Sequence, residues 1–267
     1  MGSRAWVKNV LCSRRVAHVM LTVDVETDAG SPSLRGVDEA MPVMLDVLDA
    51  VGARAVFFVV GDVALARPEL VKELSRRGHV VGSHSMTHPA FSKVGGNVVR
   101  DELTRSKQTL EALISKPCVG FRAPYFDAPR DLGIHLAHAG YKWSSSKAPF
   151  SLVAKYRDLF SSRSAHRLLG SDVLELPVPG MMGLPIPEGL PWRRLFSPLA
   201  ALAKSPPSVF YWHPYDLLDD SPVDGFSKLT RTLMQFRSGR WSREYLLELL
   251  RAWKAKGAVL APPPEVV

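Results

Sequence analysis

The fold is decided by residues 54–82, which read RAVFFVVGDVALARPELVKELSRRGHVVG. Residues 54–60 contain an unbroken apolar run, rich in Val and Phe, that is typical of a strand buried on both faces. A helix is predicted over 68–77, because Pro68 suits a first helical turn and Gly78 follows the last one. Residues 79–82 form the next strand. Strand, helix and strand in this order predict a parallel βαβ unit.

The same alternation runs along the rest of the chain. Further strands are predicted at residues 16–23, 118–122, 141–146, 173–176, 208–212 and 258–260, and further helices at 38–51, 97–115, 130–139, 225–236 and 242–256. We therefore predict an α/β fold, an irregular (β/α) barrel with about seven parallel strands. No linker divides the pattern, so residues 1–267 are expected to form a single catalytic domain.

A proline-rich excursion over residues 177–207 interrupts this rhythm, and a short helix is predicted inside it at 195–203. Long excursions in compact domains are often lids or binding loops. A surface insertion with a packing role would explain the same composition, and the sequence leaves both interpretations open.

Composition excludes several classes of protein. Hydrophobic residues make up 46% of the chain and charged residues 22%, which argues against a disordered chain, a collagen-like repeat or a coiled coil. The net charge is +8, but the basic residues are scattered and no nucleic-acid-binding motif is present, so no nucleic acid partner is expected. The sequence makes no prediction about the oligomeric state.

The apolar stretches and the cysteines indicate the cellular compartment in which the protein is expected. No segment approaches the roughly 20 apolar residues of a membrane span, and the first residues do not read as a secretory signal, so the expected location is the cytoplasm, with no membrane partner. Cys12 and Cys118 are too few for a disulfide framework and are expected to be free thiols.

Two carboxylates stand at the end of the first predicted strand. In an extended strand Asp24 and Glu26 point to the same side, because side chains alternate with a period of two. Two neighbouring carboxylates at a buried strand end need a cation or a shared proton. A solvated loop with helix-capping acids would also account for this stretch.

Two histidines, His84 and His88, follow the strand at 79–82 within the segment GSHSMTHP. At a spacing of i and i+4 on a helical turn, both imidazoles reach one metal ion. The residue after His84 is Ser85, so this is not the zincin motif, which needs Glu there. A chance pair of histidines is the ordinary alternative.

Two further strand ends carry polar residues. Arg122 stands in FRAPYF after the strand at 118–122 and is placed to pair with one of the acids. His213 ends the aromatic strand at 208–212, a position suited to a proton donor. Taken alone, each is better explained without chemistry, Arg122 as a surface arginine before a turn and His213 as an ordinary histidine.

In combination and in this order, the four motifs resemble the polysaccharide deacetylase superfamily, the carbohydrate esterases with a chitooligosaccharide deacetylase homology domain. The segment from Gly82 to Pro89 is close to the family pattern Gly-x-His-[Ser/Thr]-x-x-His-Pro, and FRAPYF is the next best match. The first motif departs from the usual Thr-Phe-Asp-Asp-Gly, since Val25 and Glu26 replace the second Asp and the Gly.

The resemblance implies a role for each motif. Asp24 becomes the catalytic base, Arg122 its orienting partner, His213 the acid that protonates the leaving amine, and the backbone N–H near Tyr125 an oxyanion donor. The ligands of a divalent metal become Glu26, His84 and His88, with Asp28 a less favoured carboxylate. The metal is expected to be Zn²⁺, with Co²⁺, Mn²⁺ or Fe²⁺ as alternatives.

Substrate contacts follow from the aromatic residues near these motifs. Sugar stacking is assigned to Tyr125, Trp143 and Trp212, with Tyr215 as a further surface. The family's fourth motif lacks its Asp here, so Asp172, Asp216 and Glu175 remain candidates to hydrogen-bond His213.

The expected function is metal-dependent removal of an N-acetyl group from a sugar or oligosaccharide by attack of an activated water molecule. The alternative is hydrolysis of another non-peptide C–N bond, as in allantoinase-like enzymes that act on small cyclic imides or ureides, some of them without a metal. A relative that binds carbohydrate but has lost catalysis is the third hypothesis.

Overall fold

The computed structural model describes residues 17–148, 162–184, 186–200 and 205–266. Its strands are β1 (Met20–Val25), β2 (Ala55–Val59), β3 (Val80–Ser83), β4 (Gly120–Phe121), β5 (Trp143–Ser144), β6 (His166–Arg167), β7 (Leu174–Glu175) and β8 (Val209–Trp212). Its α-helices are α2 (Met41–Ala50), α3 (Gly61–Ala66), α4 (Pro68–Arg76), α5 (Gly96–Ile114), α6 (Leu132–His138), α7 (Leu190–Leu195), α8 (Ser197–Ala200), α9 (Lys228–Gln235) and α10 (Arg240–Ala255).

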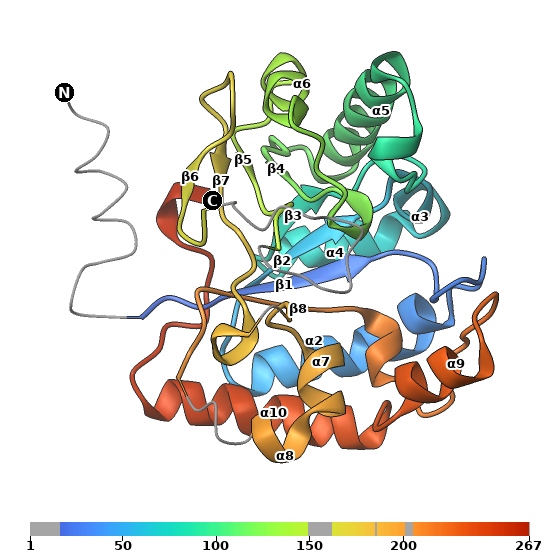
Figure 1. The fold of residues 1–267 in the computed structure, drawn as a ribbon, viewed down its shortest axis with the longest axis vertical. Helices are drawn as coiled ribbons and strands as arrows, with labels where there is room; N and C mark the ends of the chain where they lie inside the picture. The colour runs from blue at the N-terminus through green and yellow to red at the C-terminus, as the bar shows by residue number, and fades with distance from the viewer. Residues whose placement is uncertain (1–16, 149–161, 185, 201–204, 267) are drawn as a thin grey trace.

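The strands form one curled sheet in the order β6-β7-β5-β4-β3-β2-β1-β8. Seven of them are parallel, and β6 joins the edge antiparallel to β7. The helices α2 and α10 pack together on one side, while α3 to α6 cover the adjoining part of the sheet (Figure 1). The predicted irregular (β/α) barrel with about seven parallel strands is therefore confirmed.

The two faces of the sheet bury two separate hydrophobic clusters. Leu21, Val23 and Phe57 face the helices, whereas Met20 and Phe58 face the inside of the barrel. Because side chains alternate, Thr22 and Asp24 lie on the inner face with Met20. Apolar residues on both faces explain why β2 reads as a continuous apolar run.

Several element predictions need correction. The segment at 258–260 makes only an isolated bridge, Val259 to His18, rather than a strand. The first strand runs to Val25, two residues beyond the predicted end, so Asp24 lies within it. The short α3 and β6 were not predicted, because six and two residues are too few to show a periodicity. The helix predicted at 195–203 is instead α7 and α8, and residues 201–204 lie outside the described part.

The described part of the proline-rich excursion packs into the molecule. Leu190, Arg193 and Arg194 of α7 are buried, and Gly189 forms a parallel bridge with Tyr211 of β8. This favours the packing role over a lid for α7.

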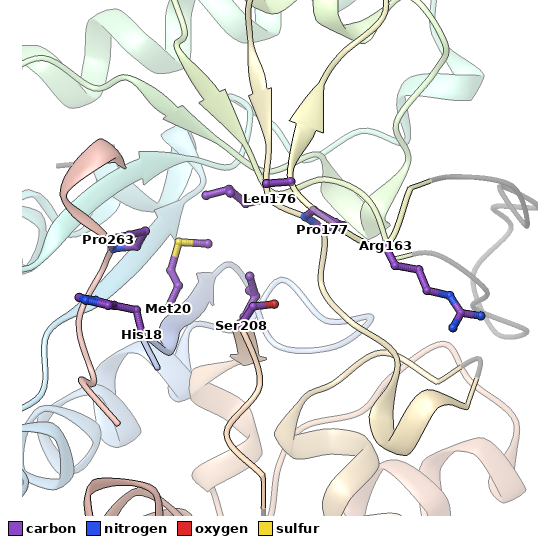
Figure 2. A pocket seen from close by; sticks show the side chains of 9 residues that line it. His18, Met20, Arg163, Leu176, Pro177, Ser208 and Pro263 are labelled. Carbon is purple, nitrogen blue, oxygen red and sulfur yellow. The ribbon is translucent and has the colours of Figure 1, made fainter. Parts of the chain in front are cut away.

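The sheet ends at β6, beside β7, and at β8, and among the described residues no strand pairing joins these two edges into a closed barrel. A narrow hollow lies there, with Leu176 and Pro177 on one side and Met20 and Ser208 on the other (Figure 2). It contains none of the predicted site residues.

The structure tests in part the expectations about membrane spans and about free cysteines. Among the described residues, no helix is both long and apolar enough to cross a membrane. Cys118 is buried without a disulfide partner in the described part, and burial raises the pKa of its thiol to about 12. Cys12 lies outside the described residues.

Candidate active site

Most of the predicted site residues line one open cleft at the carboxyl ends of the strands. The cleft has a volume of about 280 Å³. Of the predicted residues, it is lined by Asp24, Glu26, Asp28, His84, His88, Tyr125, His213 and Tyr215. The cleft is also lined by four residues for which the sequence predicted no role in the site: Phe126, Tyr211, Phe226 and Met234.

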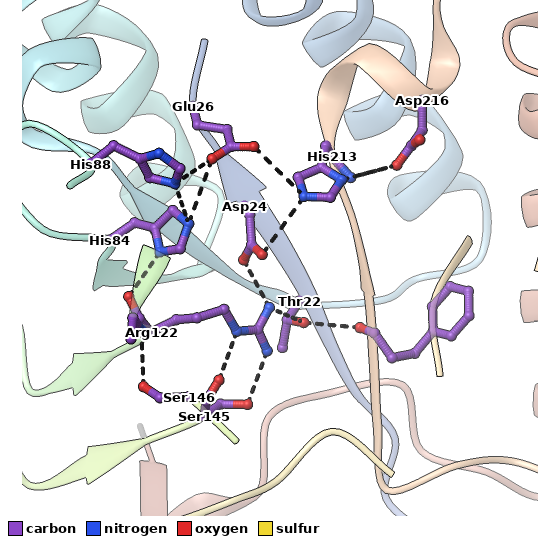
Figure 3. Close-up of polar contacts among 12 residues, drawn as sticks. Thr22, Asp24, Glu26, His84, His88, Arg122, Ser145, Ser146, His213 and Asp216 are labelled. Carbon is purple, nitrogen blue, oxygen red and sulfur yellow. Dashed lines mark hydrogen bonds and ion pairs between the residues drawn. The ribbon is translucent and has the colours of Figure 1, made fainter. Parts of the chain in front are cut away.

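Glu26, immediately after β1, lies among three histidines of the cleft. Figure 3 shows His84 and His88 on one side of its carboxylate and His213 on the other. Glu26 Oε2 is 2.5 Å from His88 Nε2 and 3.7 Å from His84 Nε2. Burial raises the pKa of Glu26, but the neighbouring histidines, His88 above all, outweigh it and hold the pKa at about 2.

The two histidines approach each other through a loop rather than a helical turn. His84 follows β3 directly, and the residues up to His88 have no helical structure. Ser85 and His88 both adopt positive φ values, 66° and 62°. The predicted i,i+4 helical geometry is therefore wrong, although the two Nε2 atoms lie 3.2 Å apart.

The donor atoms of Glu26, His84 and His88 lie within 4.8 Å of one another. His84 Nδ1 donates to the carbonyl oxygen of Arg122 at 2.8 Å. The other ring nitrogen, Nε2, is therefore the unprotonated one, and it faces Glu26. Burial lowers the pKa of His84 to about 4, which keeps its imidazole in the neutral form that binds metals. Two imidazoles and one carboxylate suit a divalent transition metal.

Asp28 is occupied elsewhere. Its Oδ2 accepts a hydrogen bond from Ser33 Oγ at 2.6 Å and its Oδ1 one from the backbone N–H of Gly36 at 2.9 Å. Asp28 is therefore not part of the ligand cluster, which leaves Glu26 as the carboxylate beside the two histidines.

Asp24 pairs with Arg122 beneath this cluster. Arg122 Nη1 lies 2.8 Å from Asp24 Oδ1, and both side chains are buried. The guanidinium also donates to Thr22 Oγ1 and to both the carbonyl and the hydroxyl of Ser145, each at 2.9 Å. It stacks over the Phe58 ring at 4.4 Å. Arg122 thus holds Asp24 in one orientation at the base of the cleft.

His213 lies opposite the two other histidines. Its Nε2 is 4.0 Å from Asp24 Oδ2 and 3.7 Å from Glu26 Oε1, and its ring stacks on Tyr215. The Tyr215 hydroxyl donates to Glu26 Oε1 at 3.3 Å. His213 therefore points into the same space as both acids.

Asp216 is the acid that contacts the far side of His213. Its Oδ2 lies 3.2 Å from His213 Nδ1, and its Oδ1 lies 3.1 Å from the buried guanidinium of Arg194. Burial lowers the pKa of His213, but the hydrogen bond and charge of Asp216, with Glu26 and Asp24, raise it to about 9. Of the three candidates named from sequence, Glu175 instead accepts the N–H groups of Ser146 and Lys147.

The aromatic residues divide into two groups. Tyr125 is 58% exposed in the cleft, with its ring 4.6 Å from that of His88. Trp143 and Trp212 are buried in the core and line no part of the cleft, so their predicted role in sugar stacking is wrong. Trp143 packs over Gly120 inside the barrel, and Trp212 faces the helices because it alternates with Tyr211 and His213.

Comparisons with known sequences find deacetylases. Residues 13–144 match the family model for polysaccharide deacetylase. A peptidoglycan-N-acetylglucosamine deacetylase of Bacillus cereus is 32% identical over 87 residues, which span 33% of this chain and 32% of that protein. The family match that the motifs predicted is therefore confirmed over residues 13–144.

Solved structures show the same fold over most of the chain. A family 4 carbohydrate esterase from Streptomyces lividans, in complex with acetate, is 17% identical with a TM-score of 0.56, and the alignment covers 91% of both chains. A family 4 pseudoenzyme from Bacillus anthracis is 16% identical with a TM-score of 0.54, over 92% of this chain and 63% of that one. The fold is thus shared by proteins described as an esterase and as a pseudoenzyme, and the side chains must carry the argument for activity.

Proposed function

We propose that this chain is a metal-dependent hydrolase that removes an N-acetyl group from a sugar or oligosaccharide. The observation that carries the proposal is the convergence of Glu26, His84 and His88. Beside them lie a buried carboxylate suited to act as a base, Asp24, and a histidine suited to donate a proton, His213. The curated relative from Bacillus cereus is named as a deacetylase of an N-acetylated sugar polymer, which agrees with this chemistry.

Glu26, His84 and His88 would hold the metal, for which Zn²⁺ is the leading choice and Co²⁺, Mn²⁺ or Fe²⁺ are the others. A divalent cation bound there would polarise the acetyl carbonyl and lower the pKa of a nearby water molecule.

The protein side chains supply the proton transfers. Asp24 accepts the proton of the attacking water, and Arg122 fixes the carboxylate for that task. His213, protonated at Nε2 and held through Nδ1 by Asp216, donates a proton to the departing amine nitrogen. The backbone N–H of Tyr125 is the proposed donor to the developing oxyanion, and the Tyr125 ring is the proposed sugar contact.

Acetate release tests this function. The protein, incubated with Zn²⁺, is assayed on N-acetylated chitooligosaccharides and, in parallel, on cyclic imides and ureides, with Asp24→Asn as the inactive control. Acetate release by the wild type alone is the expected result. Turnover of only the imides or ureides would replace the proposal with the other C–N hydrolase. Sugar binding without acetate release would indicate a non-catalytic relative.

A further inference from the structure

The loop that carries the two histidines is held in an unfavourable backbone conformation. Ser85 and His88 both have φ values in the left-handed region, which is unfavourable for a residue other than glycine. Such a loop persists only where its surroundings fix it.

Every backbone N–H from His84 to His88 has a hydrogen-bond acceptor. The N–H of His84 donates to Val59 O, that of Ser85 to Ser83 Oγ and that of His88 to Ser85 Oγ. The two remaining N–H groups, at the middle of the loop, both donate to one side chain outside the loop, that of Glu102.

Glu102 lies on α5 and is 4% exposed. Its Oε2 accepts the N–H groups of Met86 and Thr87, each at 2.8 Å, and its Oε1 accepts the Thr87 hydroxyl at 2.7 Å. No ion pair of Glu102 is found in the described part of the chain, so the carboxylate is committed to this loop. Hydrogen bonds to a carboxylate are among the stronger ones in proteins.

The opposite side of the loop is fixed by α3. The backbone N–H groups of Gly61 and Asp62 donate to the carbonyl oxygens of Ser85 and Met86, each at 2.9 Å. Gly61 also packs against Met86 so closely that a Cβ there would lie 2.3 Å from Met86 Sδ. The loop is thus clamped between α3, which donates, and Glu102, which accepts.

We propose that Glu102 is a positioning residue that pre-organises the ligand loop, so that His84 and His88 converge on Glu26 before any metal binds. Glu102 touches neither substrate nor metal in this account. It acts through the backbone of Met86 and Thr87. The effect of Glu102 on metal affinity rests on the proposed function, which places the metal at Glu26, His84 and His88.

Hydrogen exchange of the metal-free protein tests the proposal directly. Glu102→Leu keeps the side-chain bulk and removes all three acceptor contacts, so the amides of Met86 and Thr87 should exchange at least about tenfold faster. Glu102→Gln should retain slow exchange, because its amide oxygen still accepts both N–H groups while its NH₂ donates to the Thr87 hydroxyl. The matched control is Glu111→Leu, since Glu111 of the same helix accepts the N–H of Cys118 away from the loop.

The dissociation constant of Zn²⁺, measured by chelator competition, is the second readout. Glu102→Leu should weaken binding by about 10- to 100-fold relative to Glu111→Leu. Unchanged exchange at Met86 and Thr87 in Glu102→Leu, or equal acceleration there in Glu111→Leu, would overturn the proposal. A wild type that binds no Zn²⁺ would count against the proposed function, and the exchange rates would still decide the role of Glu102.

Discussion

Arg122 Nη1 and Asp24 Oδ1 lie 2.8 Å apart, and water reaches almost none of either side chain. Three further hydrogen bonds hold the guanidinium to Thr22 and Ser145. The base of the proposed mechanism therefore has a fixed position in the floor of the cleft.

Arg122→Ala would leave the Asp24 carboxylate buried without its partner. Breaking a buried pair from one side typically costs roughly 3–5 kcal/mol, so we expect a loss of that order in the free energy of unfolding, with activity abolished. Urea denaturation measures the first quantity. Arg67→Ala is the control, because its pair with Asp38 is exposed and its loss should be much smaller. Equal losses in the two variants would contradict the structural role assigned to Arg122.

Asp216→Asn removes the carboxylate that holds His213 Nδ1. We expect kcat to fall by at least about 100-fold because the proton donor loses its fixed orientation, while metal content and KM stay near wild type. Steady-state kinetics on an N-acetylated oligosaccharide measures kcat and KM separately. Asp219→Asn, at an exposed Asp paired with Arg243, is the matched control and should be nearly neutral. A variant of Asp216 with wild-type kcat would remove Asp216 from the mechanism.

Trp143 and Tyr125 should respond in opposite ways to substitution. Trp143→Phe leaves a void in the barrel and should lower the free energy of unfolding by about 1–3 kcal/mol without changing KM. Tyr125→Ala should raise KM with little effect on stability, because the ring is exposed in the cleft. Measuring KM and the free energy of unfolding in urea for both variants distinguishes a packing role from a substrate-binding role. A raised KM in Trp143→Phe alone would restore its role as a sugar platform.

His79 gives the stability of the fold a pH dependence that is separate from the cleft. Its Nδ1 accepts the N–H of Ala55 at 3.2 Å, and burial with the charge of Arg54 lowers its pKa to about 4. An unfolded histidine titrates near 6.5, so between about pH 6.5 and 4 the unfolded chain binds the extra proton. Stability should therefore fall as the pH drops through this window, by about 3 kcal/mol from this residue.

The comparison variant for His79 is His79→Asn, whose amide oxygen replaces Nδ1 as the acceptor. Urea unfolding at pH 7 and pH 4 should show a smaller loss in the variant than in the wild type. The same loss in both proteins would show that His79 does not titrate as described.

The sequence predicted those parts of the site that depend on local periodicity. Asp24 and Glu26 were expected to share a side because they stand two residues apart at a strand end, and both line the cleft. The same rule, applied to Trp212, would have placed its ring away from Tyr211 and His213, toward the helices. Trp143 was misassigned for another reason, since its position inside the barrel depends on packing against Gly120.

Contacts between distant segments were beyond sequence reasoning. Arg194 reaches Asp216 from the proline-rich excursion, where no periodicity marks it. Glu102 reads as one more polar residue on α5, and its partners Met86 and Thr87 are revealed only by the folded loop. The helical turn predicted for His84 and His88 failed because the hydrogen bonds of that loop outweigh its local preference.

Metal content per chain tests the central claim most directly, because Glu26 rather than Asp24 is proposed as the carboxylate ligand. Wild type and Asp24→Asn, incubated with Zn²⁺ and desalted, should each retain about one metal ion per chain, since one carboxylate and two imidazoles make one site. Glu26→Gln and His88→Ala should retain almost none. A wild type without metal, or metal lost from Asp24→Asn and kept by Glu26→Gln, would contradict the account.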